Sequence, residues 1–411
     1  MKIAVLGAGI VGLAATHSLI DDGHQVTLID REGPAAGASR GNAGWIAHTD
    51  IDPIASPKML RQVPKFLMDP LGPLTIRRDY FFTILPWLVR LIAASRPNKL
   101  EASIEALIAL QSLAMPAWER LATRLLLTDK IHKRGTIFAF DNHAAYGRAL
   151  PHFKRQEAAG IAINYLDRED VQALEPGLAD SIIAAAHFPA AAHVSDPAEI
   201  TKALYDAARR RNIEHVHGKV IALEPDAKGV TIRIDGREPV WADRVVIALG
   251  AWSKPVAATV GDKVPLDTER GYNVSFPNVA GSLRHPVTFQ GHGFVASPLD
   301  SGLRIGGAVE FAGLAAPPNH QRTNVMYQKA TRFIRDMPRF ESGTLWMGFR
   351  PSIPDSLPVI GPSKKSPFVI HAFGHGHYGL TQSVATGRIV TDLIAGRAPP
   401  IDLAPFSAQR F

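Results

Sequence analysis

Three glycines near the N-terminus have the spacing of a dinucleotide-binding turn. Gly7, Gly9 and Gly12 lie between a short apolar segment, residues 2–6, and a segment with apolar residues at helical spacing, residues 10–22. In such a turn the first glycine permits a tight bend, the second lets the backbone approach a pyrophosphate, and the third lets the helix pack closely on the strand. The free N–H groups at the helix N-terminus would then face the phosphates. The sequence therefore predicts a βαβ dinucleotide site.

An acidic residue at the end of a second strand completes this unit. Asp30 ends the apolar segment 25–30, where a carboxylate can accept hydrogen bonds from the ribose hydroxyls. The neighbouring Arg31 is expected beside the adenine or in solvent. The residues that we assign to this end of the site are Gly7, Ala8, Gly9, Ile10, Val11, Gly12, Asp30 and Arg31.

The turn alone does not separate FAD from NAD, but two later segments, 244–253 and 373–380, favour FAD. Residues 244–253 are an apolar strand followed by a turn of small residues, as in many FAD enzymes that bring a second strand back beneath the cofactor. Residues 373–380 place glycines before a final helix predicted at 378–395, and the loop 32–49 offers close backbone approach. The further cofactor contacts that we predict are Ser39, Arg40, Asn42, Ala43, Gly44, Val220, Gly250, Trp252, Gly376, His377, Tyr378, Gly379 and Leu380.

These segments resemble the D-amino-acid dehydrogenase branch of the glycine oxidase, sarcosine oxidase and D-amino-acid oxidase superfamily. The likeness includes Glu269-Arg270-Gly271-Tyr272, Gly348-Phe349-Arg350-Pro351 and Pro358-Val359-Ile360-Gly361, and it is least specific over 51–190. It implies oxidative deamination of a D-amino acid or cyclic imino acid by hydride transfer to flavin N5, with electrons passed to a respiratory acceptor such as a quinone. The favoured specific substrate is cis-4-hydroxy-D-proline, since some proteins of this length in the branch oxidise it.

The resemblance also implies three residues that act on the substrate. Arg350 would pair with the substrate carboxylate, because a guanidinium presents two parallel donors to two oxygens. Tyr272 would add its hydroxyl to the same carboxylate or to the amine side, and His48 would face the flavin or the substrate. The alternatives are a surface arginine, a tyrosine packed in a sheet and a structural loop histidine. One of His375 and His377 is expected to touch the flavin.

Two rival functions stay open at this point. The first is an oxidase of glycine, sarcosine or another N-methylated amine, which would use oxygen and release peroxide. The second is a non-catalytic or partner-dependent flavoprotein subunit, which would bind flavin without oxidising an amino acid by itself. The sequence hardly separates either from a dehydrogenase.

The composition limits the kinds of partner and site. The 411 residues include 45 Lys and Arg against 38 Asp and Glu, a net charge of +7 that favours anionic cofactors, carboxylate substrates or a membrane surface. Nucleic acid is not expected, because no run of five like charges occurs. With no cysteine, a cysteinyl link to FAD is excluded and the cofactor is expected to be non-covalent. We also expect no metal site, and cytoplasmic residence because Met1 leads directly into the first strand.

An apolar segment at 76–96 is interrupted or flanked by Arg77, Arg78, Arg90 and Arg96. It is shorter than the roughly 20 apolar residues that a span requires. It could form a buried core helix, or it could lie on the inner face of a membrane as a peripheral contact.

The coarse pattern of elements predicts an α/β fold with two intertwined domains. A Rossmann-type FAD domain would take residues 1–50, 190–264 and 346–411. An inserted α+β substrate domain with an antiparallel sheet would take 51–189 and 265–345. We further expect irregular structure with short helices over 53–98, a long helix over 99–126 kinked near Pro116, and Asp196 as the cap of a helix at 197–211.

Overall fold

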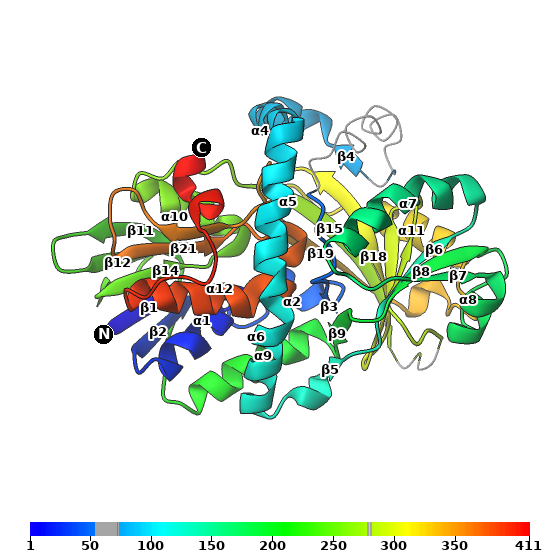
Figure 1. The fold of residues 1–411 in the computed structure, drawn as a ribbon. Coiled ribbons are helices and arrows are strands. Elements are labelled where there is room, and N and C mark those ends of the chain that lie inside the picture. Colours follow the sequence, from blue (N-terminus) through cyan, green and yellow to red (C-terminus); the bar gives the residue numbers. More distant parts are fainter. Residues whose placement is uncertain (54–71, 73, 278, 280–281) are drawn as a thin grey trace.

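The computed structural model describes residues 1–53, 72, 74–277, 279 and 282–411, which form two lobes with a large sheet in each (Figure 1). The first lobe contains a six-stranded sheet in which only the last strand runs antiparallel to its neighbour. In spatial order its strands are β10 (Glu214–His217), β2 (Gln25–Asp30), β1 (Lys2–Leu6), β14 (Arg244–Ile247), β21 (Val369–Phe373) and β20 (Val359–Pro362).

Helices and a small sheet bury this first sheet. The two central strands, β1 and β14, are continuous buried apolar runs after their first residue, as expected of parallel strands that are covered on both faces. One core cluster joins the sheet to α1 (Ile10–Asp21), α9 (Pro197–Arg209) and α12 (Gly379–Ile394). A second cluster joins it to α10 (Ser253–Thr259) and to an antiparallel sheet of β11 (Val220–Pro225), β12 (Val230–Ile234) and β13 (Val240–Ala242).

The second lobe is built on a larger sheet whose strands are mostly antiparallel. Its order is β19 (Thr344–Ser352), β15 (Asp267–Pro277), β18 (Gly302–Phe311), β17 (Phe294–Leu299), β16 (Val287–Phe289), β6 (Thr136–Phe140), β8 (Ala184–Phe188) and β7 (Asn164–Asp167), and β4 (Leu74–Ile76) pairs with β18. The helices α7 (His143–Ala158), α8 (Arg168–Leu174) and α11 (Gln321–Ala330) pack on it. The predicted α/β fold with an antiparallel substrate sheet is confirmed.

The boundary between the two lobes differs from the prediction at two places. Strand β19 pairs with β15, so residues 346–352 belong to the second sheet and not to the first lobe. Helices α5 (Pro97–Ser112) and α6 (Ala114–Leu125) were assigned by sequence to the substrate domain, but they pack against α12 of the first lobe (Figure 1). A short sheet of β3 (Trp45–Ile46), β9 (Ala192–Val194) and β5 (Ile131–His132) lies in the connecting segments.

Proline explains why the helix expected over 99–126 is two helices. The ring of Pro116 would clash with the carbonyl of Ser112, four residues earlier, if a single helix continued. Helix α5 ends at Ser112 and Pro116 lies in the first turn of α6, where a missing N–H costs nothing. Asp196 caps α9 as predicted, because its carboxylate accepts hydrogen bonds from the Ala198 and Glu199 N–H groups.

The stretch predicted to be irregular contains a regular helix. Part of 53–98 lies outside the described residues, but α4 (Phe81–Ala94) is a 14-residue helix despite Pro86, because Ile84, Trp87 and Leu91 bury one face of it. Within the described part of the chain, no helix is both long enough and apolar enough to span a bilayer. Short helical turns occur at α2 (Ala38–Gly41), η1 (Arg78–Tyr80), η2 (Thr128–Lys130), η3 (Gly250–Trp252), η4 (Phe340–Ser342), η5 (Gly376–Tyr378), η6 (Ala404–Phe406) and η7 (Ala408–Arg410).

Candidate active site

A large cavity extends from the glycine turn after β1 to the inner face of the second sheet. Its volume is about 1230 Å³, which exceeds the roughly 300–1,000 Å³ of a typical small-molecule pocket. Gly7 and Gly9 of the first lobe line one end, and Gly271 and Arg350 of the second lobe line the other. The volume and the lining from both lobes fit an extended dinucleotide together with a small substrate.

The three glycines of the turn are required for different reasons. A Cβ atom at Gly7 would clash with the Ala248 carbonyl oxygen, and one at Gly12 would clash with the Gly7 carbonyl oxygen. Packing within the protein therefore excludes a side chain at both positions. A Cβ atom at Gly9 would approach, among the described residues, only Ser39 Oγ at 3.3 Å, yet Gly9 lines the cavity. The space beside Gly9 is thus left on the ligand side, as close approach of a pyrophosphate requires.

Asp30 and Arg31 form the wall near the expected adenosine end. The two Asp30 carboxylate oxygens accept hydrogen bonds from the Ala8 N–H at 2.8 Å and from the Glu32 and Gly33 N–H groups at 2.7 Å. Asp30 therefore orders the turn itself and also lines the cavity. The Arg31 guanidinium lies 3.9 Å from the centroid of the Trp252 ring, so a cation–π pair forms part of this wall.

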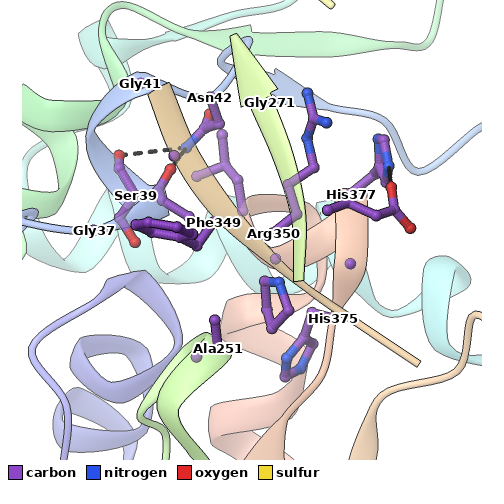
Figure 2. Close-up of a pocket in the computed structure, with 18 of the residues that line it drawn as sticks. Gly37, Ser39, Gly41, Asn42, Ala251, Gly271, Phe349, Arg350, His375 and His377 are labelled. Carbon is purple, nitrogen blue, oxygen red and sulfur yellow. Dashed lines mark hydrogen bonds and ion pairs between the residues drawn. The ribbon is translucent and has the colours of Figure 1, made fainter. Parts of the chain in front are cut away.

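The loop after β2 is fastened to both lobes. Ser39 Oγ accepts a hydrogen bond from the Ile10 N–H, the first residue of α1, at 2.9 Å. From the second sheet, Asn273 donates to the Gly41 carbonyl at 2.7 Å and Arg304 donates to the Asn42 carbonyl at 2.6 Å. The backbone of this loop is therefore held over the cavity from both sides (Figure 2).

The segment before α12 lines the middle of the cavity. Gly374 and Gly376 have φ angles of +84° and +52°, a left-handed backbone that favours glycine. His375 is buried and hydrogen-bonded to Thr386 at 3.0 Å, and burial lowers its pKa to about 3, so it is neutral. Tyr378 donates its hydroxyl to the Asp52 carbonyl at 3.3 Å. Of the two histidines, His377 is the one whose ring bonds to an acidic group of the cavity wall.

The register of β15 and β19 sets the far end of the cavity. Glu269 lies directly opposite Arg350, and Gly271 lies opposite Gly348. Residues opposite each other in an antiparallel pair share a face, so the acid and the base are neighbours on the cavity side. A Cβ atom at Gly271 would clash with the Arg350 guanidinium, which therefore needs a glycine beneath it. Figure 2 shows Gly271, Arg350 and His377 together on one side of the cavity.

Arg350 retains hydrogen-bonding capacity within the cavity. Among the described residues it donates one hydrogen bond, from Nη1 to the Ala308 carbonyl at 3.1 Å. A guanidinium has five N–H donors. Burial lowers the pKa of Arg350, and the nearby charge of Glu269 opposes that shift. The remaining donors are thus available to an anion in the cavity.

Glu269 is a buried carboxylate for which the sequence predicted no role beyond its place in a family motif. It accepts hydrogen bonds from His377 Nε2 at 2.8 Å and from Ser352 Oγ at 2.5 Å. Burial alone would raise its pKa, but His377, Ser352 and the charge of Arg350 bring the pKa below its ordinary value. Glu269 is therefore ionised. Its partner His377 lies more than a hundred positions along the chain, so local sequence contained no signal for the pair.

Two of the residues predicted to act on the substrate have other partners. Tyr272 lines the cavity, but its hydroxyl donates to Glu310 at 2.5 Å and accepts from the Asn319 N–H at 3.1 Å. The geometry therefore favours the alternative interpretation of Tyr272 as a tyrosine packed in the sheet. His48 does not line the cavity; its Nδ1 lies 3.2 Å from the Ile46 carbonyl, and burial lowers its pKa. The structural interpretation of the loop histidine is favoured in the same way.

Asp50 is a further acid at the cavity that the sequence analysis did not select. It lines the cavity, and no described side chain or backbone N–H donates to its carboxylate. Burial raises its pKa to about 6, with the positive charge of His152 acting against the shift. The described residues contain no group of three or more His, Asp or Glu side chains that could hold a metal ion.

Most of the predicted cofactor contacts surround the cavity. Those that line it are Gly7, Gly9, Ile10, Val11, Asp30, Arg31, Ser39, Asn42, Ala43, Val220, Gly250, Trp252, Gly376, His377, Tyr378, Gly379 and Leu380. Four others do not, for physical reasons. The Ala8 N–H is bound to Asp30, Gly12 packs on Gly7, Arg40 is exposed to solvent, and the Gly44 carbonyl accepts a hydrogen bond from the Val194 N–H.

Comparison with known proteins agrees with this geometry. Residues 2–393 match the family model described as FAD dependent oxidoreductase. The chain is 35% identical to a D-amino-acid oxidase of Bradyrhizobium diazoefficiens, over 100% of this chain and 98% of the relative. It is 28% identical to a D-amino acid dehydrogenase of Rhizobium johnstonii, over 100% of both. The structure superposes on glycine oxidase from Geobacillus kaustophilus with a TM-score of 0.74 at 22% identity, over 100% and 99% of the two chains.

The family model and the cavity identify the cofactor. The space beside Gly9 and the carboxylate of Asp30 would suit the pyrophosphate and ribose of FAD, and the cavity has room for the rest of this cofactor. The protein is an enzyme that uses FAD, and the chain belongs to the family of FAD-dependent oxidoreductases.

Proposed function

We propose that the protein oxidises the amine-bearing carbon of a D-amino acid or a cyclic imino acid. The observation that carries this proposal is the pairing in register of Glu269 and Arg350 on the cavity wall. An amino acid carries a carboxylate and an amino group on one carbon. An anion and a cation side by side on the wall are complementary to those two groups.

In this proposal Arg350 binds the substrate carboxylate through two parallel N–H donors. The guanidinium is partly buried in the cavity wall, so a carboxylate there would be shielded from bulk water, and a charge-assisted hydrogen bond would be stronger than at the surface. Because the Arg350 guanidinium packs closely on Gly271, the orientation of its plane is restricted. Arg350 would thus fix the orientation of the substrate as well as its position.

Glu269 would accept a hydrogen bond from the amine of the same substrate. Its ionised carboxylate is held by His377 and Ser352, so its position does not depend on the substrate. Asp50, with a pKa of about 6, could accept the proton that an ammonium group must lose before oxidation. When bound, FAD supplies the chemistry, as the acceptor of the hydride from the substrate carbon. The lack of cysteine supports non-covalent binding of this cofactor.

The names of the relatives support a D-amino acid as the substrate class. Both curated relatives quoted above are named for D-amino acids, one as an oxidase and one as a dehydrogenase. Within this class we propose cyclic imino acids, with cis-4-hydroxy-D-proline as the first compound to test. We also propose a quinone of the respiratory chain as the electron acceptor. The reducing cytoplasm would be the compartment, since the chain has no cysteine.

The substrate is tested by mixing the purified holoenzyme with each candidate compound in the absence of oxygen. Reduction of the flavin is measured as the loss of its absorbance. The panel is cis-4-hydroxy-D-proline, D-proline, D-alanine, their L-enantiomers, glycine and sarcosine. Bleaching by D-compounds at rates far above those of the L-enantiomers would support the proposal. Equal rates for both enantiomers would contradict it, and no bleaching by any compound would favour a flavoprotein that needs a partner.

A second candidate function follows from the 35% identical relative that is named an oxidase. An oxidase would pass electrons to oxygen and release hydrogen peroxide. Turnover with a reducing substrate should be compared in the presence of oxygen alone and of a soluble quinone under argon. Peroxide formation as fast as quinone reduction would replace the proposed dehydrogenase by an oxidase.

A further inference from the structure

Helix α4 has two apolar faces, and the residues that the structure describes cover only one of them. Ile84, Trp87 and Leu91 are buried, and Trp87 packs on Phe311 of the second sheet with a ring-centroid separation of 5.1 Å. Trp87, Leu88 and Leu91 also line the cavity. The covered face therefore forms part of the wall of the active-site cavity.

The opposite face carries large apolar side chains in solvent. Phe82 is 82% exposed, and Val89 and Ile92 are each 57% exposed. Phe81 and Leu85 are exposed by 40% and 41%. At about 100° per residue these five positions lie within one arc of the helix, so they form a continuous apolar stripe. Single exposed apolar residues are ordinary, but a contiguous stripe of this kind marks an interaction surface.

The stripe is bordered by positive charge. Arg78, Arg90, Arg96 and Lys99 are exposed, and no acidic residue occurs between Phe81 and Arg96. Asp79, just before the helix, is already paired with Arg77. A helix with apolar residues on one face and basic residues beside that face is typical of helices that lie in the interface of a lipid bilayer. The charge is complementary to the anionic headgroups of a bilayer.

The stripe is attached rigidly to the second lobe. Tyr80, at the start of α4, donates its hydroxyl to the Asp267 carboxylate of β15 at 3.0 Å. Its ring lies against Gly313, where a Cβ atom would be 2.8 Å from Tyr80 Cε2. Leu314, the residue after Gly313, is itself a 40% exposed apolar side chain. Figure 1 shows α4 at the outer edge of the molecule.

We propose that the exposed face of α4, with its basic border, binds the surface of an anionic lipid bilayer. The occupant of this surface is lipid, because an apolar stripe flanked by basic residues matches the acyl boundary and the anionic headgroups of a bilayer at the same time. Docking in this way would place the cavity wall formed by Trp87, Leu88 and Leu91 next to the membrane. The proposal does not depend on the substrate or on the electron acceptor.

Sedimentation of the holoenzyme with vesicles tests the proposal in the absence of substrate. Vesicles of phosphatidylcholine with phosphatidylglycerol should bind the protein at low salt, and vesicles of phosphatidylcholine alone should bind it at least about tenfold more weakly. The variant Phe82→Ser/Val89→Ser/Ile92→Ser should lose binding by about tenfold or more, because its apolar contact with the acyl boundary is removed. Arg78→Glu/Arg90→Glu should lose binding to the anionic vesicles to a similar extent.

The control is Leu126→Asn, which removes an 86% exposed leucine far along the chain from α4. Leu126 has a φ of +58°, a conformation that asparagine tolerates, so the fold should be kept. Flavin content and thermal melting show whether the α4 variants are folded. Absence of vesicle binding by the wild type, equal binding to neutral vesicles, or unchanged binding by the triple serine variant would overturn the proposal. Wild-type oligomers that the triple variant abolishes, without vesicle binding, would assign the stripe to self-association instead.

Discussion

The two ends of the cavity are built in different ways. At the dinucleotide end, Gly7, Gly9, Gly12 and Asp30 lie within 24 consecutive residues, and backbone groups make most of the contacts. At the substrate end, side chains make the contacts, and they come from three separate segments, with Glu269 and His377 lying 108 positions apart in the chain. The first end is a local chain conformation, and the second is a product of strand register.

Because the two ends are built differently, we expect substitutions at one end to leave the binding function of the other end intact. A change in the glycine turn should alter the affinity for FAD and leave substrate recognition in the loaded enzyme intact. A change at Glu269 or Arg350 should alter substrate recognition and leave FAD affinity intact. Coupled losses at both ends would show that the two ends are one cooperative unit.

The largest effect is expected from Gly9→Ala. The added methyl group meets only Ser39 Oγ within the described protein, so the apoprotein should fold, but the methyl group would occupy the approach to the pyrophosphate. FAD affinity should fall on the order of 100-fold, about 2.7 kcal/mol. Titration of the apoprotein with FAD, followed by flavin fluorescence, measures this loss.

Gly12→Ala is the matched variant for this test. Its Cβ atom would clash with the Gly7 carbonyl oxygen, so it should destabilise the fold itself, by about 1–3 kcal/mol as overpacking does. Urea denaturation of the two apoproteins separates the cases. Equal destabilisation of Gly9→Ala and Gly12→Ala would mean that Gly9 is also fixed by packing and not by the ligand.

The next largest effect is expected from Arg350→Lys. A lysine keeps the charge but cannot present two parallel donors to a carboxylate. Loss of one charge-assisted hydrogen bond of about 1.5–3 kcal/mol should raise KM about 10- to 100-fold, with FAD affinity unchanged. The control is Arg304→Lys, since Arg304 also lines the cavity but binds the Asn42 carbonyl at 2.6 Å. Unchanged kinetics for Arg350→Lys would remove Arg350 from the substrate site.

A smaller effect, about tenfold in kcat/KM, is expected from Glu269→Gln. Glutamine retains the shape and an amide oxygen that can still accept a hydrogen bond, so only the charge-dependent part of the about 1.5–3 kcal/mol of a hydrogen bond to a charged group should be lost. His377→Asn should cause a milder loss, because it only weakens the support of Glu269. Steady-state kinetics across pH measure both variants. A loss in His377→Asn larger than that in Glu269→Gln would indicate a direct role for His377.

The smallest effect is expected from His193, a residue of β9 in the segments that connect the lobes. Burial, with the charges of His132 and Arg134, lowers its pKa to about 3, whereas the unfolded chain binds a proton near pH 6.5. The contribution of neutral, buried His193 to the free energy of unfolding is therefore fully present above pH 6.5, and it falls as the pH drops toward 3. The slope is at most about 1.4 kcal/mol per pH unit.

His193→Gln should remove this slope without affecting either end of the cavity. Urea denaturation at pH 7.5, 6.5 and 5.5 compares the acid dependence of the variant with that of the wild type. Parallel curves over this range would show that His193 does not carry the acid sensitivity, and the buried His17, whose pKa is lowered to about 4, would then be tested in the same way.

Elements whose geometry depends on neighbouring residues could be predicted from the sequence. The βαβ unit, the glycine turn, the Asp196 cap and the helix α12 follow from backbone conformation and short-range hydrogen bonds, which a local pattern specifies. The same reasoning failed over 99–126, where a proline near the middle could mean a kink or a break, and over 53–98, where packing of Trp87 and Leu91 made a helix regular.

Which distant side chains come into contact depends instead on the packing of the whole chain. The register of β15 and β19 places Glu269 beside Arg350, and the start of α12 brings His377 to the same acid. In the same packing, the Tyr272 hydroxyl donates a hydrogen bond to Glu310, and His48 does not line the cavity. Strand register is set by long-range burial and pairing, and a shift of one residue would reverse every side chain. For this reason local sequence patterns pointed to most residues that line the glycine-turn end of the cavity, whereas at the other end Arg350 was expected from the family resemblance and Glu269 was given no role.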